Sequence, residues 1–208
     1  MTNAVTTRDK IMDIAEGSIL AKGFNATSIE EIIAAAGITK SGFFYHFPDK
    51  SALAKALLLR YFVQEKTILD DIFNRGRELS EDPLQGFLIS LKLFAEAMYN
   101  LPEAHPGCLI ATYCYQDRMF DQEIRQLMRE GVLEWRERFL KLIGEIEEHY
   151  QPRDPVDREA LADMINTVIE GGIVMSKALN DPRSLGDQVM LFRSYIKLLY
   201  EPRSLKAA

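Results

Sequence analysis

Apolar residues recur three and four positions apart along almost the whole chain, a spacing that places them on one face of an α-helix. No stretch alternates apolar and polar residues in the way that a half-buried strand requires. Glycine, proline and short polar stretches interrupt the helical pattern at intervals, for example at Gly23, Gly37 and Pro48. We therefore predict an all-α protein of about nine helices.

The N-terminal end has the best-marked helix boundaries. A first helix is expected over residues 7–22 and a second over residues 28–36. Ser28 and Glu31 form a capping box at the start of the second helix, because the hydroxyl and the carboxylate can each satisfy a backbone N–H of the first turn. Gly37 ends this helix.

A third, short helix follows after a turn that contains Gly37. Thr39 can cap its start, and it must end by Phe47 because Pro48 disfavours helical geometry in the residue before it. Asp49 can then cap a long fourth helix. Two short helices joined by a turn with glycine form the helix-turn-helix pattern, whose second helix enters the major groove of DNA.

The remaining helices are predicted to be longer, as a helical bundle requires. They are expected near residues 84–100, 108–115, 121–149, 157–180 and 184–201. We divide the chain into a three-helix DNA-binding domain of the helix-turn-helix type, residues 1–52, and a helical domain, residues 53–208. The fourth helix is expected to continue from the first domain into the second.

The overall charge of −6 argues at first against a nucleic-acid partner, but the charges are unevenly distributed. Residues 1–60 hold seven Lys or Arg and six Asp or Glu, whereas residues 61–208 hold eighteen and twenty-five. Between Gly37 and Arg60, four basic residues stand against Asp49 alone. A cationic end on an acidic body is compatible with a protein that contacts phosphates at one end only.

Several other classes of protein are disfavoured. No apolar run reaches the ~18 residues that a membrane-spanning helix needs. The N-terminus has neither the basic flank nor the apolar core of a signal peptide, so we expect a cytoplasmic protein with no membrane partner. Cys108 and Cys114 fit a reducing compartment and, without clustered histidines, make a poor zinc site. We predict no metal and no cofactor.

An all-α enzyme is the main rival function. The chain lacks the H-E-x-x-H, G-x-S-x-G and phosphate-binding glycine motifs, and its three histidines, His46, His105 and His149, lie far apart in sequence. We therefore predict that the protein is not an enzyme. A helical protein-interaction module whose N-terminal end does not bind DNA is the other alternative.

The helix-turn-helix segment separates into an inward and an outward face. The residues suited to fill its core are Ile29, Ile32, Ile33, Phe43 and Phe47. The outward residues carry hydroxyls, an ammonium and an imidazole, which donate to phosphate oxygens or meet base edges; they are Thr39, Lys40, Ser41, Tyr45 and His46. Gly42 removes bulk on the outward side, and Lys50 adds a cation at the start of the next helix. The alternative is a helical hairpin with a solvated polar face.

The string GITKSGFFYHFPDK, from Gly37 to Lys50, closely resembles the signature of the TetR family of transcriptional regulators. The upstream string GFNATSIEEI, from Gly23 to Ile32, also resembles that family in the expected register. The resemblance covers residues 8–59, and beyond them only the general helical layout is similar. It implies a repressor that binds operator DNA as a homodimer. The DNA contacts that it implies, position by position, are Ser28, Thr39, Lys40, Ser41, Gly42, Tyr45, His46 and Lys50.

One position departs from the family pattern. The family often has tyrosine where this chain has Phe44. The resemblance therefore implies that any phosphate hydrogen bond from a hydroxyl at this place is absent here.

The resemblance implies that the two C-terminal helices form the dimer interface. A two-fold operator requires a dimer, whose two recognition helices lie about 34–36 Å apart. The first helix carries the apolar stripe Ile165, Val168, Gly172, Met175 and Leu179, and the second carries Val189, Phe192, Ile196 and Leu199. Gly171 and Gly172 each cost ~1 kcal/mol relative to alanine in a helix, which a close approach between helices would explain. The alternative is that both stripes face the chain's own core.

Residues 91–139 are the expected place of a small-molecule effector, because their aromatic and methionine side chains can line an apolar cavity. The candidate lining residues are Phe94, Met98, Cys108, Tyr113, Tyr115, Met119, Trp135 and Phe139. A filled core is the alternative for each of them. We predict a sequence-specific repressor that a small apolar or aromatic effector releases from its operator.

Overall fold

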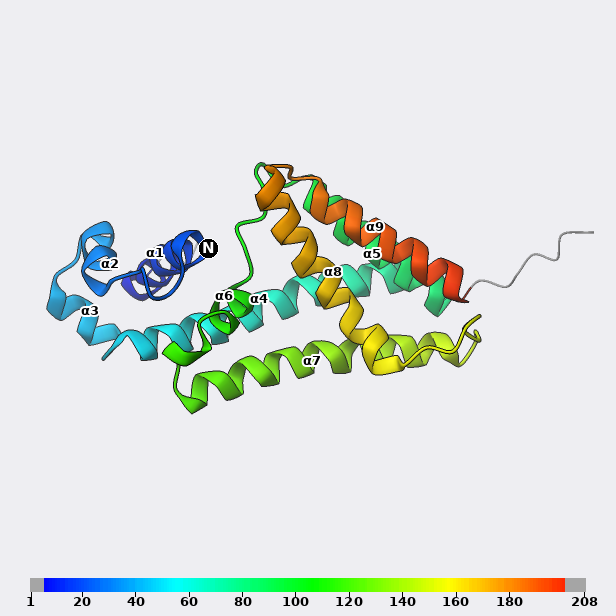
Figure 1. The fold of residues 1–208 in the computed structure, drawn as a ribbon, viewed down its shortest axis with the longest axis horizontal. Coiled ribbons are helices and arrows are strands. Elements are labelled where there is room, and N and C mark those ends of the chain that lie inside the picture. Colours follow the sequence, from blue (N-terminus) through cyan, green and yellow to red (C-terminus); the bar gives the residue numbers. More distant parts are fainter. Residues whose placement is uncertain (1–5, 201–208) are drawn as a thin grey trace, which may run out of the picture. The chain divides into compact units, whose positions relative to one another are not determined.

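Residues 6–200 are described by the computed structural model, which shows nine α-helices and one short 3-10 helix in that range and no strand (Figure 1). In chain order these are α1 (Thr7–Lys22), α2 (Ile29–Ala36), α3 (Lys40–His46), α4 (Lys50–Leu79), α5 (Pro83–Tyr99), α6 (Leu109–Cys114), η1 (Asp117–Met119), α7 (Gln122–Glu147), α8 (Arg158–Leu179) and α9 (Ser184–Tyr200). The all-α prediction is confirmed, and a helix lies at each predicted place.

Local capping chemistry fixes the ends of α2 and α3. The Ser28 hydroxyl accepts a hydrogen bond from the backbone N–H of Glu31, and the Thr39 hydroxyl accepts one from that of Gly42, both at 3.1 Å. Gly37 has a φ of 64°, the left-handed conformation that ends α2 and that glycine adopts without a steric cost. These short-range bonds set the turn between the two helices before any long-range packing is considered.

The Glu31 carboxylate has a different partner from the one predicted for a capping box. It accepts a hydrogen bond from Nζ of Lys22, at the end of α1, over 2.6 Å. A charge-assisted bond to an ammonium is stronger than one to a neutral backbone N–H. The same hydrogen bond lowers the pKa of the Glu31 carboxyl.

The described residues form two compact units. The head unit comprises the described residues up to Glu65 together with Pro106–Gly131, and the body unit comprises Lys66–His105 together with the described residues from Val132 onward. Both α4 and α7 contribute residues to each unit. The head unit is therefore larger than the domain of residues 1–52 that the sequence suggested.

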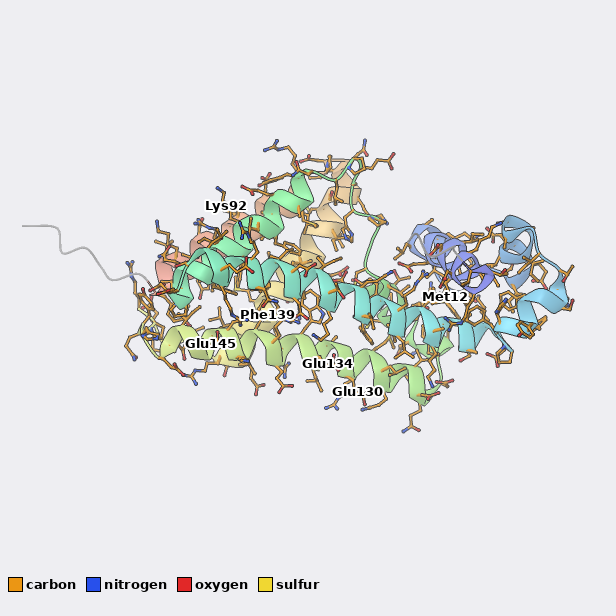
Figure 2. The ribbon with its side chains drawn as sticks, turned by 180° about the vertical axis from the view of Figure 1, so that it is seen from behind. Met12, Lys92, Glu130, Glu134, Phe139 and Glu145 are labelled. Atoms are coloured by element: carbon orange, nitrogen blue, oxygen red, sulfur yellow. The ribbon has the colours of Figure 1, made fainter. Side chains whose placement is uncertain are left out.

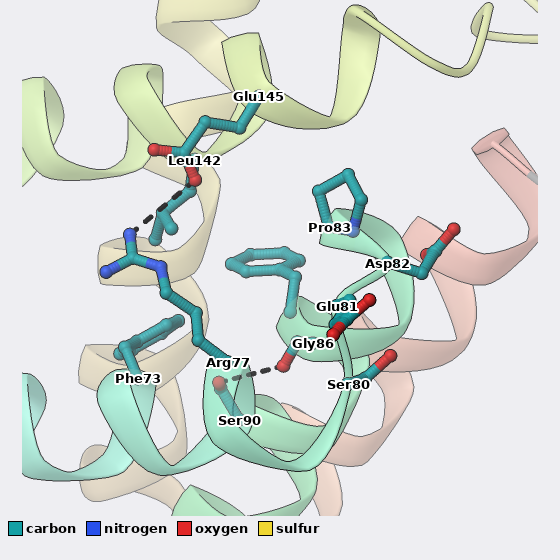
Figure 3. A pocket seen from close by; sticks show the side chains of 11 residues that line it. Phe73, Arg77, Ser80, Glu81, Asp82, Pro83, Gly86, Ser90, Leu142 and Glu145 are labelled. Carbon is teal, nitrogen blue, oxygen red and sulfur yellow. Dashed lines mark hydrogen bonds and ion pairs between the residues drawn. The ribbon is translucent and has the colours of Figure 1, made fainter.

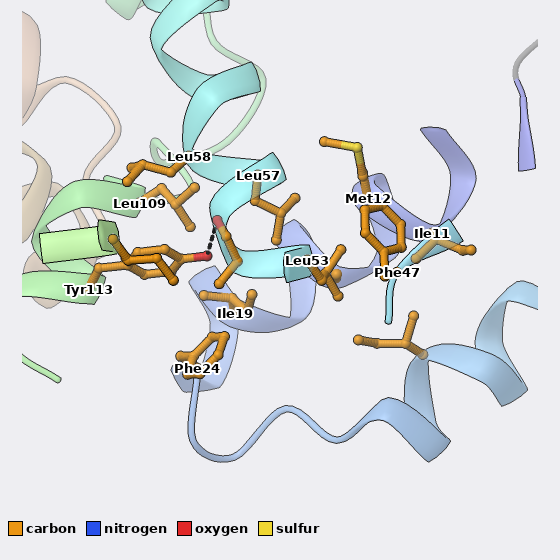
Figure 4. Close-up of a cluster of buried hydrophobic side chains, with 14 of the residues drawn as sticks. Ile11, Met12, Ile19, Phe24, Phe47, Leu53, Leu57, Leu58, Leu109 and Tyr113 are labelled. Atoms are coloured by element: carbon orange, nitrogen blue, oxygen red, sulfur yellow. Dashed lines mark hydrogen bonds between the residues drawn. The ribbon is translucent and has the colours of Figure 1, made fainter. Parts of the chain in front are cut away.

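Aromatic packing explains why α6, η1 and the start of α7 belong to the head unit. The ring of Phe24, in the loop after α1, lies 4.6 Å from the ring of Phe120, and Tyr113 of α6 stacks on Phe120 at 4.4 Å. The Tyr113 hydroxyl donates to the backbone carbonyl of Ala54 in α4 over 3.3 Å (Figure 4). Tyr113 is fully buried, so this contact lies inside the core.

The body unit is built on helix pairs that pack closely. A Cβ added to Gly172 of α8 would lie 2.8 Å from Cδ1 of Leu185 in α9, so the glycine permits the two helices to approach. Phe139 lies on α7 (Figure 2). Its ring packs against that of Phe73 of α4, with centroids 5.7 Å apart. Within residues 6–200, no helix is both long enough and apolar enough to cross a membrane.

Candidate nucleic-acid interface

The second helix of the helix-turn-helix, α3, is anchored from its inner side by two aromatic rings. Phe43 is fully buried and Phe47 is almost so. Their ring centroids are 6.0 Å apart. Together with the Thr39 cap, these rings fix which side of α3 faces outward.

The outward side of α3 is polar and well exposed. Lys40, Ser41 and Tyr45 are exposed, and the Tyr45 side chain reaches 85% exposure. The hydroxyls of Thr39 and Ser41 are hydrogen-bonded to each other at 3.0 Å. The first turn of α3 therefore presents an ammonium and two hydroxyls, the groups that meet base edges in a major groove.

The structure gives a local reason for a glycine at position 42 that the sequence did not reveal. A Cβ at this position would lie 3.3 Å from the Thr39 hydroxyl oxygen, which is tighter than an ordinary contact. The glycine thus protects the cap of α3. Its half-buried position is also compatible with the predicted close approach to a groove wall.

The predicted phosphate contacts differ in how available they are. The Ser28 hydroxyl accepts from Glu31 and keeps its own O–H for donation. Tyr45 and His46 lie edge to face at 5.0 Å, with the His46 side chain half-buried and Tyr45 open to solvent. Tyr45 is accordingly the more accessible of the pair.

Lys50 is placed differently from the prediction of a phosphate contact. Its Nζ donates to the backbone carbonyl of Phe24 over 2.5 Å and lies 4.2 Å from the centroid of the Phe24 ring. Burial lowers the pKa of the Lys50 ammonium. Because the side chain folds back onto the loop after α1, it stabilises the head unit itself.

Arg8 is a candidate that sequence reasoning missed. It lies in the first turn of α1, is exposed, and has its guanidinium 5.1 Å above the ring of Phe47, the residue that ends α3. Its only signal in the sequence is a basic residue near the start of the first helix. The structure places this exposed cation beside the residue that ends α3.

The predicted dimer stripe on α9 faces the chain's own core. Its four residues are at most 5% exposed: Val189, Phe192, Ile196 and Leu199. On α8, Ile165 is also buried and Gly172 packs on Leu185 of the same chain, whereas Met175 and Leu179 are exposed and Val168 is half-buried. This corrects most of the predicted interface, because the buried stripe of α9 packs against α5, where Arg193 donates to the Leu88 carbonyl at 2.9 Å.

A second apolar stripe remains uncovered on the same two helices. We call it the exposed apolar face; it consists of Met164, Val174, Met175 and Leu179 on α8 and Leu191, Tyr195 and Leu198 on α9. The side chains of this set are 36–63% exposed. Gly171 precedes Val174 and Met175 by three and four residues, about one helical turn, and an added Cβ there would have no atom within 4 Å.

The predicted effector residues do not share one environment. Phe94, Met98, Trp135 and Phe139 belong to the body unit, and Cys108, Tyr113, Tyr115 and Met119 belong to the head unit. Tyr113 is a core residue, as described above, whereas Tyr115 and Met119 are 83% and 51% exposed. Phe139 is likewise buried against other aromatic rings. The filled-core alternative therefore holds for Tyr113 and Phe139.

A pocket of about 210 Å³ lies elsewhere in the body unit, where the end of α4, the start of α5 and α7 meet (Figure 3). Phe73, Phe87 and Leu142, each at most 7% exposed, contribute apolar walls. At its rim Arg77 and Glu145 form a loose ion pair at 3.6 Å. The other lining residues are Ser80, Glu81, Asp82, Pro83, Gly86 and Ser90. None of the eleven belongs to the set predicted from the sequence.

Comparison with known proteins supports the same interpretation over most of the chain. The profile of the family described as bacterial regulatory proteins, tetR family, matches residues 11–57. The profile described as tetracyclin repressor-like, C-terminal domain, matches residues 90–190. The first covers the helix-turn-helix, and the second covers α6, α7 and α8 with most of α5 and part of α9.

Individual relatives agree with these profiles. The HTH-type transcriptional regulator YxaF of Bacillus subtilis is 22% identical over 187 residues, which is 89% of this chain and 92% of that protein. The HTH-type transcriptional repressor KstR2 of Rhodococcus jostii is 31% identical over 112 residues, covering 54% of this chain and 50% of that one. The crystal structure of a TetR-family regulator from Agrobacterium tumefaciens superposes with a TM-score of 0.76 over 94% of this chain and 98% of that chain, at 17% identity. The helix-turn-helix geometry, both profiles and these relatives together show that the chain belongs to the TetR family of transcriptional regulators, which are DNA-binding proteins and not enzymes.

Proposed function

We propose that this protein is a homodimeric repressor that reads an operator with α3 and leaves it when a small molecule binds in the body unit. The observation that carries the proposal is the outward side of α3. Lys40, Ser41 and Tyr45 are exposed there on a helix whose opposite side is held by buried phenylalanines. A helix fixed in this way presents the same side chains to every operator that it meets.

The polar groups around α3 divide into two roles. Thr39, Lys40 and Ser41 lie at its N-terminal end, the part of a recognition helix that contacts base edges. The proposed phosphate contacts are Ser28, Tyr45, His46 and Arg8. Phosphate contacts fix the register on the duplex, whereas base contacts select the sequence.

The exposed apolar face is the proposed dimer interface. Its residues on α9, Leu191, Tyr195 and Leu198, are spaced four and three positions apart, which makes one continuous helical stripe. A contiguous patch of large exposed apolar residues is typical of a protein–protein interface. Gly171 would allow the α8 helix of the partner to approach closely.

The pocket beside Phe73 and Phe87 is the proposed effector site. Its walls are apolar, and its lining includes the charged residues Arg77, Glu81, Asp82 and Glu145. Arg77 pairs with Glu145, the Asp82 carboxylate accepts from the Gln85 backbone N–H and the Tyr150 hydroxyl, and Glu81 leaves the lining with an excess of negative charge. This balance favours a neutral or cationic molecule with an apolar group over an anion. At about 210 Å³ the pocket is smaller than the roughly 300–1,000 Å³ typical of drug-sized ligands, so the effector is small.

One helix connects the proposed effector site to the DNA-reading helix. α4 begins at Lys50, directly after the helix-turn-helix, and its later turns supply Phe73 and Arg77 to the pocket. A ligand that shifts those turns acts on a helix whose first turns pack in the core of the head unit. A coupling free energy of about 1–3 kcal/mol would change operator affinity by roughly 5- to 150-fold.

The proposal is tested by selecting binding sites from genomic fragments with the purified protein and titrating the selected duplex with salt. We expect log affinity to fall linearly with log salt, at about −0.9 per neutralised phosphate. Lys40→Ala should weaken binding and change the selected sequence. Lys92→Ala, which removes an exposed lysine of α5, is the matched control and should change neither (Figure 2). No fragment enriched above background, or equal losses from both variants, would refute DNA reading by α3.

The effector part of the proposal has its own test. Small aromatic amines, their neutral alcohol analogues and their carboxylate analogues are compared for release of the selected duplex. We expect the amines or alcohols to act and the carboxylates to fail, with Glu145→Gln weakening the response to amines. A response that is strongest for carboxylates would overturn the proposed pocket chemistry.

A further inference from the structure

Phe44 is an exposed aromatic ring on the DNA-reading helix. Its side chain is 40% exposed, whereas the neighbouring Phe43 is fully buried. It stands four residues after Lys40, so both side chains lie on the same side of α3. An aromatic ring without a hydroxyl makes no hydrogen bond to solvent, so the exposed part of the ring is available to an apolar partner.

Two contacts orient the Phe44 ring. From the inner side, the ring of Phe43 meets it edge to face, with centroids 5.4 Å apart and planes at 85°. From the outer side, Nζ of Lys40 lies 6.0 Å from the Phe44 centroid, at the outer limit of a cation–π contact. The ring and the ammonium thus form an adjacent apolar and cationic pair on the exposed side.

The chemistry of the major groove gives such a pair a specific target. A phenyl ring has no hydrogen bond to offer a phosphate, but an apolar side chain discriminates thymine through its 5-methyl group. Lysine donates to the O6 and N7 acceptors of guanine. We propose that Phe44 packs on the 5-methyl group of a thymine that neighbours a guanine contacted by Lys40. This inference rests on the proposed reading of the operator by α3 and adds the base that Phe44 selects.

The expected size of the effect follows from the methyl group alone. Removing one apolar methyl from water contributes about 0.8 kcal/mol, which corresponds to about fourfold in affinity. Because a homodimer reads two half-sites, replacing the thymine in both is expected to weaken binding about sixteenfold.

The test replaces each thymine of the selected duplex, one position at a time, by deoxyuridine. This change removes only the 5-methyl group and keeps Watson–Crick pairing. We expect one thymine in each half-site whose replacement weakens binding of the native protein about fourfold. In Phe44→Ala that same replacement should have no effect, whereas Ile68→Ala, an exposed apolar residue of the body unit, should keep the full effect.

A second measurement needs no variant and so does not depend on how Phe44→Ala folds. The sensitive T·A pair is replaced by C·G, with either cytosine or 5-methylcytosine. The methylated duplex should bind the native protein about fourfold more tightly. The inference is overturned if no thymine is sensitive, if the sensitivity persists in Phe44→Ala, or if the cytosine methyl group changes nothing. In each of these cases native binding to the selected duplex remains, so the failure is distinct from a failure of the proposed function.

Discussion

Alanine at Gly172 is expected to destabilise the protein, whereas alanine at Gly144 is expected to stabilise it. Both glycines lie inside α-helices of the body unit, so alanine gains about 0.5–1 kcal/mol of helix preference at either position. Their surroundings differ. A Cβ at Gly172 would lie 2.8 Å from Cδ1 and 3.0 Å from Cα of Leu185, whereas at Gly144 nothing lies within 4 Å.

The magnitude depends on which atom of Leu185 must move. Its Cδ1 can rotate away, but its Cα belongs to the backbone of α9 and yields only if the helix shifts. Overpacking of this kind costs about 1–3 kcal/mol, more than the helix preference returns. We therefore expect Gly172→Ala to lower the free energy of unfolding by about 1–2 kcal/mol, and Gly144→Ala to raise it by about 0.5–1 kcal/mol.

The assay is urea unfolding followed by circular dichroism and by the fluorescence of Trp135. All proteins are compared at one concentration, because the stability of a dimer depends on it. If the slope of the unfolding free energy against urea concentration is unchanged, the shift in the urea midpoint reports stability alone. A midpoint for Gly172→Ala that rises as far as that of Gly144→Ala would refute the close packing of α8 on α9.

Three further substitutions test other contacts. Lys50→Met should lower the free energy of unfolding by about 1–2 kcal/mol, because the Phe24 carbonyl loses a charged donor. It should leave the salt dependence of DNA binding unchanged. A shallower salt dependence would instead show that Lys50 contacts a DNA phosphate. Leu191→Glu should convert dimers to monomers in sedimentation velocity, while Leu79→Glu, exposed at the end of α4, should not; a dimer that survives at Leu191 contradicts the proposed face. Tyr113→Phe should cost about 1 kcal/mol in thermal or urea unfolding through the lost bond to Ala54, and a neutral result would show that this bond contributes nothing.

The helix-turn-helix could be predicted from the sequence because its boundaries depend on neighbours in the chain. Ser28 and Thr39 each cap a helix by accepting from a backbone N–H three residues ahead. Gly37 ends α2 through its own backbone conformation. None of these features needs knowledge of distant residues. Glu31 departs from its predicted role because Lys22, nine positions away, competes for its carboxylate.

Which face of the C-terminal helices is buried could not be predicted in the same way. α9 carries two apolar stripes, one through Phe192 and Ile196 and one through Leu191 and Tyr195. Periodicity identifies both stripes but does not say which of them packs against α5. That choice is made by long-range packing, so the stripe predicted as an interface is core.

The proposed effector pocket could not be predicted from the sequence for a related reason. Aromatic content marks residues that fill cores as readily as residues that line cavities, and Tyr113 is fully buried. The pocket instead draws Phe73 and Phe87 from the consecutive helices α4 and α5 and Leu142 from α7, which follows only after α6 and η1. A cavity forms where side chains from several helices leave space unfilled, and no single segment of the sequence specifies that arrangement.

Ion pairs within the head unit change what its charges imply for DNA recognition. Lys22 and Lys55 are paired with Glu31 and Glu123, and Arg60 bonds Asp13 and Glu16 of α1. With Lys50 turned onto Phe24, Arg8, Lys10 and Lys40 are the cations between residue 6 and Glu65 that form no ion pair within 4 Å of a carboxylate.

A low number of available cations limits how much affinity phosphate contacts can supply. Each phosphate contact adds about −0.9 to the slope of log affinity against log salt, and this contribution is the same for every DNA sequence. The base contacts proposed at the N-terminal end of α3 and at Phe44 would then supply the discrimination, since one wrong base pair costs about 1–3 kcal/mol. The acidic total charge of the chain is therefore compatible with operator recognition, because it weakens non-specific binding to DNA and leaves base contacts untouched.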